Sequence, residues 1–249
     1  MSVSFELIQH PGSTLSCPDA VATGPHSFLQ LKDWLEQYYQ IRQDCFRQEL
    51  GIRTFDGSED NFDRNGYLLV ALDQGRCIGG VRLSVSRPDA PVLLPLEING
   101  FMLQELFPEI VRNGESYSQW TRLALLPEYR TPQILHQMAL MLIWHAKSLD
   151  CSYSFNVAGM NRARLYQRLH RIQGFHYEIL RDLKIPEEGS FMGLEHLLSV
   201  GYLKQQSSQQ LLSRQLVHRT AQTHCRELVE LSAMSGVNTG DFVLQRSNG

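Results

Sequence analysis

The sequence predicts a mixed α/β fold built on one sheet. Two strand-like runs, 67–73 and 76–86, are separated only by Gln74-Gly75, which predicts an antiparallel hairpin. Further along the chain, from 116 to 185, strand-like and helix-like segments alternate, which is typical of strands joined by crossover helices. A hairpin followed by this alternation requires a sheet with both antiparallel and parallel neighbours.

The N-terminal part should begin with a strand at 3–8 and continue with a helix over 27–50. In that helix Leu31, Leu35, Tyr38, Arg42 and Phe46 recur every three or four residues, so one largely apolar face carries an arginine. A polar loop should connect the helix to the hairpin.

The remaining elements follow from apolar periodicity and from the turn residues that end each run. One segment, 194–203, is open between a strand and a helix. We expect a main domain over 1–204 and a helical extension over 205–249. The elements expected in the main domain after the hairpin are a short helix at 98–110, a strand at 116–126, a helix at 132–149, a strand at 153–159, a helix at 160–172 and a strand at 174–185.

Composition narrows the function classes. The 249 residues are 43% hydrophobic with a net charge of −3 and no basic stripe, so nucleic acid is not an expected partner. Five cysteines without a CxxC pair argue against a disulfide framework or a zinc site and favour a reducing compartment, and the histidines lack metal-ligand spacing. No apolar run is long enough to span a bilayer and no secretion signal is evident, so we expect a cytoplasmic protein.

Charged residues in a strand context are the first functional signal. Alternation in the run 76–86 places Arg82 on the face opposite Val81 and Leu83, and an unpaired buried charge is very costly. Asp60 and Asp63 precede the hairpin and are the nearest candidate partners, although both could instead be turn formers. Arg122 lies in another predicted strand. Arginines and carboxylates together suit a zwitterionic substrate, whose amine and carboxylate they would hold.

Several short motifs occur together in an order that resembles a known family. They are Arg-x3-Phe (Arg42, Phe46), Glu-Leu-Gly at 49–51, Asp-Asn-Phe-Asp at 60–63, Arg-Leu at 82–83 and Thr-Arg-Leu-Ala at 121–124. Over about residues 41–175 the chain resembles the acyl-homoserine-lactone synthases, which share the wider fold of the GNAT N-acetyltransferases. The resemblance implies a GNAT-like acyltransferase domain whose sheet is splayed near Trp120–Leu125.

The resemblance also implies a reaction and a site. Family members transfer a fatty acyl group from acyl carrier protein, or from acyl-CoA, to the amine of S-adenosylmethionine; these are co-substrates, and no cofactor or metal is expected. The implied catalytic set is Gln119, Thr121 and Arg122. The implied substrate-binding residues are Arg42, Phe46, Asp60, Asp63 and Arg82.

Two departures from the family pattern leave the amine acceptor open. Ile52 stands where the family usually has a tryptophan, and Gln119 where it usually has a glutamate. A glutamine can position a water but cannot act as a base. The alternatives are therefore a related N-acyl amino acid synthase, or a catalytically inactive protein of this fold that binds an acyl carrier protein or a lipid signal.

The acyl-donor side favours a protein-borne acyl group. The segment after the strand at 116–126 contains Arg130 but lacks the glycine-rich turn with which acetyl-CoA-using relatives bind pyrophosphate. Tyr166 matches their general-acid tyrosine, but its distance to Gly174 is a helical turn longer. Leu135, Met138, Met141 and Leu142 could line an acyl slot or belong to ordinary core. Arg162, Arg164, Arg168 and Arg171 form a basic cluster that suits an acidic carrier protein, or is a solvated helix face.

Overall fold

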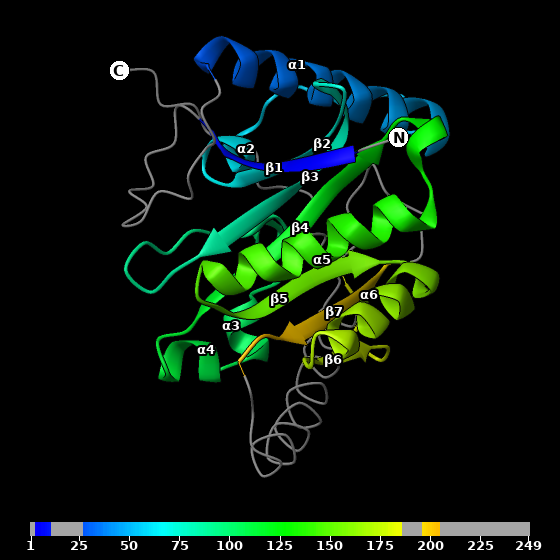
Figure 1. Cartoon of the computed structure of the whole chain (residues 1–249). Helices are drawn as coiled ribbons and strands as arrows, with labels where there is room; N and C mark the ends of the chain where they lie inside the picture. The colour runs from blue at the N-terminus through cyan, green and yellow to red at the C-terminus, as the bar shows by residue number, and fades with distance from the viewer. Residues whose placement is uncertain (1–2, 11–26, 186–195, 205–249) are drawn as a thin grey trace. The chain divides into compact units, whose positions relative to one another are not determined.

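The computed structural model describes residues 3–10, 27–185 and 196–204, and within them one seven-stranded sheet has the order β1-β2-β3-β4-β5-β7-β6 (Figure 1). β4 and β5 are parallel, and all other neighbours are antiparallel. The predicted mixed α/β sheet is therefore confirmed. The expected helical extension over 205–249 lies outside the described residues.

The strands match the predicted runs closely except the one expected at 174–185, which is shorter, and the ambiguous segment at 194–203 contains a strand. That strand, β7, lies between β5 and β6 although it follows both in the sequence. The strands are β1 (Val3–Gln9), β2 (Tyr67–Asp73), β3 (Arg76–Ser86), β4 (Ser116–Leu125), β5 (Cys151–Ala158), β6 (His176–Leu180) and β7 (Leu197–Tyr202).

Three long helices pack on this sheet. They are α1 (Phe28–Asp44), which continues into a π-helical turn η1 (Cys45–Glu49), α5 (Pro132–Ser148) and α6 (Met160–Ile172). The short helical elements are α2 (Asn61–Arg64), η2 (Pro95–Asn99), α3 (Leu103–Leu106), α4 (Glu109–Arg112) and η3 (Pro127–Tyr129).

Two expectations about local structure were wrong. The loop before the hairpin contains α2, a single helical turn that we had not expected. The helix expected at 98–110 is instead three short elements, η2, α3 and α4. Gly100 has a left-handed φ of 79° and Pro108 precedes α4, and both break a continuous helix.

The long helices cover opposite faces of the sheet. α1 packs Trp34, Leu35 and Tyr38 onto Leu68 and Val70 of β2 and Cys77 of β3. The side chains of β2 that alternate with these, such as Leu69, belong to the core that α5 covers. Two apolar layers therefore hold the sheet between α1 on one side and α5 with α6 on the other (Figure 1).

The regular pairing of β4 with β5 stops in the middle of β4. The last paired residues are Trp120 and Asn156, although β4 continues to Leu125 and β5 to Ala158. On its other edge β4 carries a β-bulge, because Arg122 and Leu123 face the single residue Val81 of β3. The strands are thus splayed at the predicted place, and a fork opens beyond Trp120.

Candidate active site

A cavity of about 600 Å³ occupies the fork between β4 and β5. Its walls come from β3, β4 and β5, from η1, α2, η2, α5 and α6, and from Ile185 and His196, which flank residues 186–195. Phe46, Asp60, Arg82, Gln119, Thr121 and Arg122, all predicted site residues, are among those that line it.

Strand alternation divides this cavity into two sides. Arg82 is paired with Thr121, and Ser84 with Gln119, so these four side chains share the sheet face on which η2 lies. Trp120 is on the other face, where it contacts Tyr166 and His170 of α6. We call these the η2 side and the α6 side of the fork.

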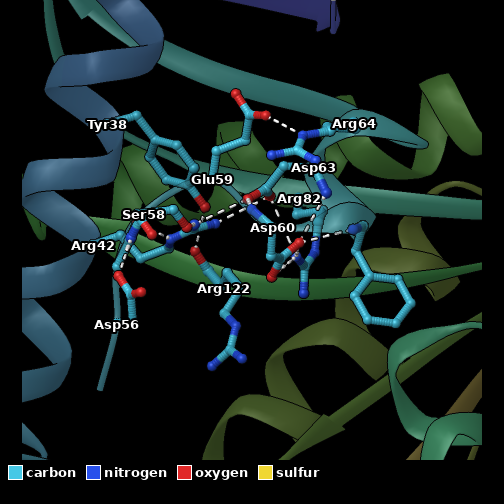
Figure 2. A network of polar contacts seen from close by, with 12 residues as sticks. Tyr38, Arg42, Asp56, Ser58, Glu59, Asp60, Asp63, Arg64, Arg82 and Arg122 are labelled. Atoms are coloured by element: carbon cyan, nitrogen blue, oxygen red, sulfur yellow. Dashed lines mark hydrogen bonds and ion pairs between the residues drawn. The ribbon is translucent and has the colours of Figure 1, made fainter. Parts of the chain in front are cut away.

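On the η2 side Arg42, Asp60, Asp63 and Arg82 form one network, which we call the acidic network (Figure 2). Arg42 donates to both carboxylate oxygens of Asp63, at 3.0 and 2.9 Å. Arg82 donates through Nη1 to Asp60 at 2.6 and 2.7 Å and to Asp63 at 3.2 Å. The arginine in the middle of a strand is therefore paired by the two acids expected from the sequence.

The two acids also fix the first turn of α2. Asp60 Oδ1 accepts hydrogen bonds from the backbone N–H groups of Phe62 and Asp63, and Asp63 Oδ2 accepts one from the N–H of Asp60. This reciprocal capping box satisfies amides at the start of the helix. A helix of only four residues is consequently held in place by its caps and by the two arginines.

Asp60 and Asp63 differ in exposure and therefore in chemistry. The Asp63 side chain is fully buried, whereas that of Asp60 is 37% exposed and lines the cavity. Burial by itself would raise the pKa of Asp60, but the adjacent Arg82 guanidinium outweighs it and holds this pKa below its ordinary value. Asp60 is an anion at neutral pH and a weak base.

Arg122 extends away from this acidic network, as Figure 2 shows. It occupies the β4 bulge with a left-handed φ of 61°. Its guanidinium carbon lies 4.7 Å from the ring centre of Phe55 and 5.6 Å from that of Phe46. The bulge and the aromatic rings thus orient an arginine that lines the cavity.

A tyrosine of α1 holds the bulge. The Tyr38 hydroxyl donates to the Arg122 carbonyl oxygen at 2.7 Å, and burial raises the pKa of Tyr38 to about 12, so the hydroxyl keeps its proton. The Tyr38 ring lies against Gly80, where a Cβ would come within 2.9 Å of a ring carbon. Gly80, the second glycine of the β3 sequence "GGVRLS", is needed for this close approach.

Arg42 and Asp63 require a correction. The sequence placed both against the substrate, but they are 1% and 0% exposed and neither lines the cavity. Arg42 is bound to Asp63 and to the carbonyl oxygens of Gly57 and Ser58. Because these contacts use its Nε and both terminal nitrogens, the pair lies behind the cavity wall and supports Asp60 and Arg82.

Gln119 and Thr121 line the cavity but already have partners. Gln119 Oε1 accepts a hydrogen bond from the N–H of Leu96 at 3.0 Å, which ties η2 to β4. Thr121 Oγ1 accepts one from Arg82 Nε at 2.9 Å. Ile52, which replaces the expected tryptophan, packs in a small core with Phe46 and Phe55 and does not line the cavity.

Apart from Arg162, the α6 side of the cavity is mainly apolar among the described residues. Of the four residues expected to line an acyl slot, Leu135, Met138 and Leu142 line the cavity, and Met141 does not. Tyr166 also lines it, with its ring edge-on to that of Trp120 and the two ring centres 5.4 Å apart.

Arg130, at the turn before α5, pairs with Glu49 and donates to the Leu125 carbonyl at 2.8 Å.

The predicted basic cluster on α6 divides into two parts. At 3.6 residues per turn, Arg164, Arg168 and Arg171 lie within about 60° of one another, and all three are exposed. Arg162 falls on the opposite side of the helix and lines the cavity. We call Arg164, Arg168 and Arg171 the α6 stripe.

The sequence interpretation missed His196 and Asn156, which also line the cavity. Asn156 belongs to the fork because β5 pairs with β4, where its partner is Trp120. His196 belongs to the fork only because β7 pairs with β5, a pairing that no local pattern announces. Among the described residues, no group of three His, Cys, Asp or Glu side chains could hold a metal ion. No helix among these residues is long and apolar enough to cross a membrane.

Comparisons with solved structures give remote similarities. FeeM, an N-acyl amino acid synthase from uncultured soil microbes, is 9% identical over 81% of this chain and 91% of its own, with a TM-score of 0.48. BjaI, a CoA-dependent acyl-homoserine lactone synthase, is 16% identical over 76% and 82% (TM-score 0.47), and the AHL synthase LasI is 14% identical over 82% and 90% (TM-score 0.47). No curated protein sequence matches the chain significantly.

A family comparison based on sequence is more specific. The model of the N-acyl amino acid synthase FeeM family matches residues 37–178, more than half of the chain. This span runs from α1 to β6 and contains the acidic network, the β4 bulge and the arginines of α6. The predicted N-acyltransferase is thereby confirmed, and the chain belongs to the FeeM N-acyl amino acid synthase family.

Proposed function

We propose that this enzyme transfers a fatty acyl group from the thioester of an acyl carrier protein to the α-amine of an amino acid. The cavity in the fork carries the proposal, because Asp60, Arg82 and Arg122 line its η2 side, whereas its α6 side is mainly apolar apart from Arg162. A zwitterionic acceptor and a long acyl chain could therefore meet between the strands.

Each charged group on the η2 side has a role in this proposal. Asp60 remains partly exposed and anionic, and it binds the substrate ammonium group. Arg122, oriented by the bulge and by two aromatic rings, binds the carboxylate. Arg82 keeps Asp60 in position, and Arg42 with Asp63 supports both from behind the wall.

The transfer is direct in this proposal. Among the described residues that line the cavity there is no serine or cysteine, and the one threonine, Thr121, already accepts a hydrogen bond from Arg82. The amine nitrogen attacks the thioester carbon, the C–N bond forms and the C–S bond breaks. Correct placement of the two substrates then supplies much of the rate enhancement.

The carrier protein is the finer part of the proposal. Acyl carrier proteins are acidic, and the α6 stripe offers three exposed guanidinium groups on the helix that also borders the cavity. Complementary charges of this kind mainly raise the association rate. Arg162, on the cavity side of α6, is placed to contact the phosphopantetheine arm of a donor.

The test is a product analysis with purified enzyme. Octanoyl-acyl carrier protein is mixed with each amino acid, or with S-adenosylmethionine, and products are identified by mass spectrometry while thiol release is followed. An N-octanoyl amino acid supports the proposal. An acyl-homoserine lactone would identify S-adenosylmethionine as the acceptor, and absence of any acylated amine would favour the inactive binding protein.

A further inference from the structure

Acylation of an amino acid needs a group that removes a proton from the amine. At neutral pH the acceptor is an ammonium ion without a free lone pair, and it must lose a proton before or during attack. The inference below rests on the proposed function, and it concerns which residue performs this step.

The described residues lining the cavity include six ionisable side chains. These are Asp60, Arg82, Arg122, Arg162, Tyr166 and His196. Arginine does not give up its proton in proteins, so three of the six are excluded. The choice is therefore between Asp60, Tyr166 and His196.

Asp60 and Tyr166 are poor proton acceptors. Both Asp60 oxygens accept from Arg82, and the pKa of this carboxyl is held below its ordinary value. Burial raises the pKa of Tyr166, so its hydroxyl stays protonated. Gln119, at the position where related enzymes carry glutamate, has no basic group and is bound to Leu96.

His196 lies on the required side of the sheet. It immediately precedes β7, whose Leu198 and Val200 pair with Val157 and Phe155 of β5. Phe155 is itself paired with Gln119, so its side chain lies on the η2 side, where the amine would bind. Every second residue, counted back from Val200 through Leu198 of β7 to His196, faces the same side. Because Val157, Ala158 and Gly159 also line the cavity, His196 borders the open end of the fork.

We propose that His196 is the general base of acyl transfer. Its imidazole takes a proton from the substrate ammonium, the amine attacks the thioester carbon, and the C–S bond breaks. The imidazolium then protonates the leaving thiolate, and the regenerated imidazole takes the second ammonium proton and passes it to solvent. The other charged side chains among the described residues of the cavity walls are Asp60 at the start of α2, Arg82 from β3, Arg122 from β4 and Arg162 from α6.

The experiment compares His196→Gln with wild type over a range of pH. Glutamine keeps a polar side chain but cannot accept the proton, so kcat should fall by about 10²- to 10⁴-fold, with little change in KM for either substrate. The decline of wild-type kcat at acidic pH should be replaced by a rate that rises steadily with pH. Added imidazole should restore part of the rate.

A second readout separates a base from a structural residue. An amino acid amide has a less basic amine, more of which is already neutral at the assay pH, so the loss caused by His196→Gln should be smaller with this acceptor. A structural defect would lower both rates equally. His176→Gln, at an exposed position of β6, is the matched control, and His196→Asn serves if the glutamine variant does not fold.

The outcomes distinguish this inference from the proposed function. If wild type makes N-acyl amino acids and His196→Gln retains its kcat and its acidic limb, His196 is not the base and the proposed function stands. An equal loss with both acceptors, without imidazole rescue, also overturns the role. If wild type acylates no amine at all, the proposed function fails and this inference with it.

Discussion

The acidic network on the η2 side and the α6 stripe are both clusters of arginines, yet their surroundings are opposite. Arg42 and Arg82 are each 1% exposed and bind carboxylates at hydrogen-bond distance. Arg164, Arg168 and Arg171 are exposed, and none has an ion-pair partner within the described part of the chain. A buried network must be internally matched, whereas an exposed stripe stays available to a partner.

This difference predicts where a charge change should affect folding and where it should affect catalysis. Removing a charge from the buried network leaves its partner uncompensated in a low-dielectric interior. Changing the α6 stripe alters only a solvated surface. The two regions should therefore respond to mutation in different assays.

The largest effect on folding is expected from Asp63→Asn. Asp63 is fully buried between Arg42 and Arg82, and breaking a buried pair from one side costs about 3–5 kcal/mol. The free energy of unfolding, measured by urea denaturation, should fall by this amount. Asp89→Asn, at an exposed acid, is the matched control. Unchanged stability of Asp63→Asn would mean that the network does not hold the fold together.

The next effect is expected from Asp60→Asn, and it should appear in catalysis. Asparagine can still accept the backbone hydrogen bonds that cap α2, and Arg82 retains its contact with Asp63, so stability should fall less than in Asp63→Asn. Loss of one charge-assisted hydrogen bond to the ammonium should lower kcat/KM for the amine by about 10- to 100-fold. The KM for the acyl donor should not change. A defect confined to the donor would contradict the role of Asp60.

How far the sequence could predict these two regions depends on the range of the interactions. The hairpin and the long helices follow from the periodicity of apolar residues, which is visible in the local sequence. The pairing of Arg82 with Asp60 and Asp63 follows from the high cost of an unpaired charge in a strand. The capped turn of α2 was not recognised, because Asp60 and Asp63 also read as loop residues. The sequence could not predict that Arg42 and Asp63 lie behind the cavity wall. Residue spacing shows which face of a helix a side chain is on, but not how deeply that face is buried.

The α6 side shows the same limit. Wheel geometry alone separates Arg162 from the α6 stripe, so this division was available from the sequence once α6 was assigned as a helix. The position of His196 could not be predicted from the sequence, because this residue enters the fork through the insertion of β7 between β5 and β6. That insertion is a property of the whole sheet. Sequence reasoning found residues that act through local neighbours and missed those brought in by topology.

A smaller effect is expected from reversing the α6 stripe. The combined change Arg164→Glu, Arg168→Glu and Arg171→Glu should raise KM for acyl carrier protein by roughly 10-fold at low ionic strength and less at high salt, because steering is screened. Turnover at saturating donor and the use of octanoyl-pantetheine should be unchanged. The matched control is Arg53→Glu with Arg112→Glu, at exposed arginines of other elements. An equal loss with both donors would show that the stripe is not a docking surface.

The smallest expected effect is a difference between the two regions in how the free energy of unfolding depends on pH. Because the pKa of Asp60 is lower in the folded protein than its ordinary value of about 4, its pairing with Arg82 stabilises the fold above that value. The contribution is lost as the pH falls through the lower, folded-state value. The difference in unfolding free energy between wild type and Asp60→Asn should therefore be constant from about pH 5 to 7 and shrink below about pH 4. The variant Arg164→Gln, Arg168→Gln, Arg171→Gln should show no such acid-dependent difference, because the α6 stripe has no carboxylate partner among the described residues. A matching acid dependence in that variant would mean that the stripe is paired like the buried network, and would remove the contrast between the two regions.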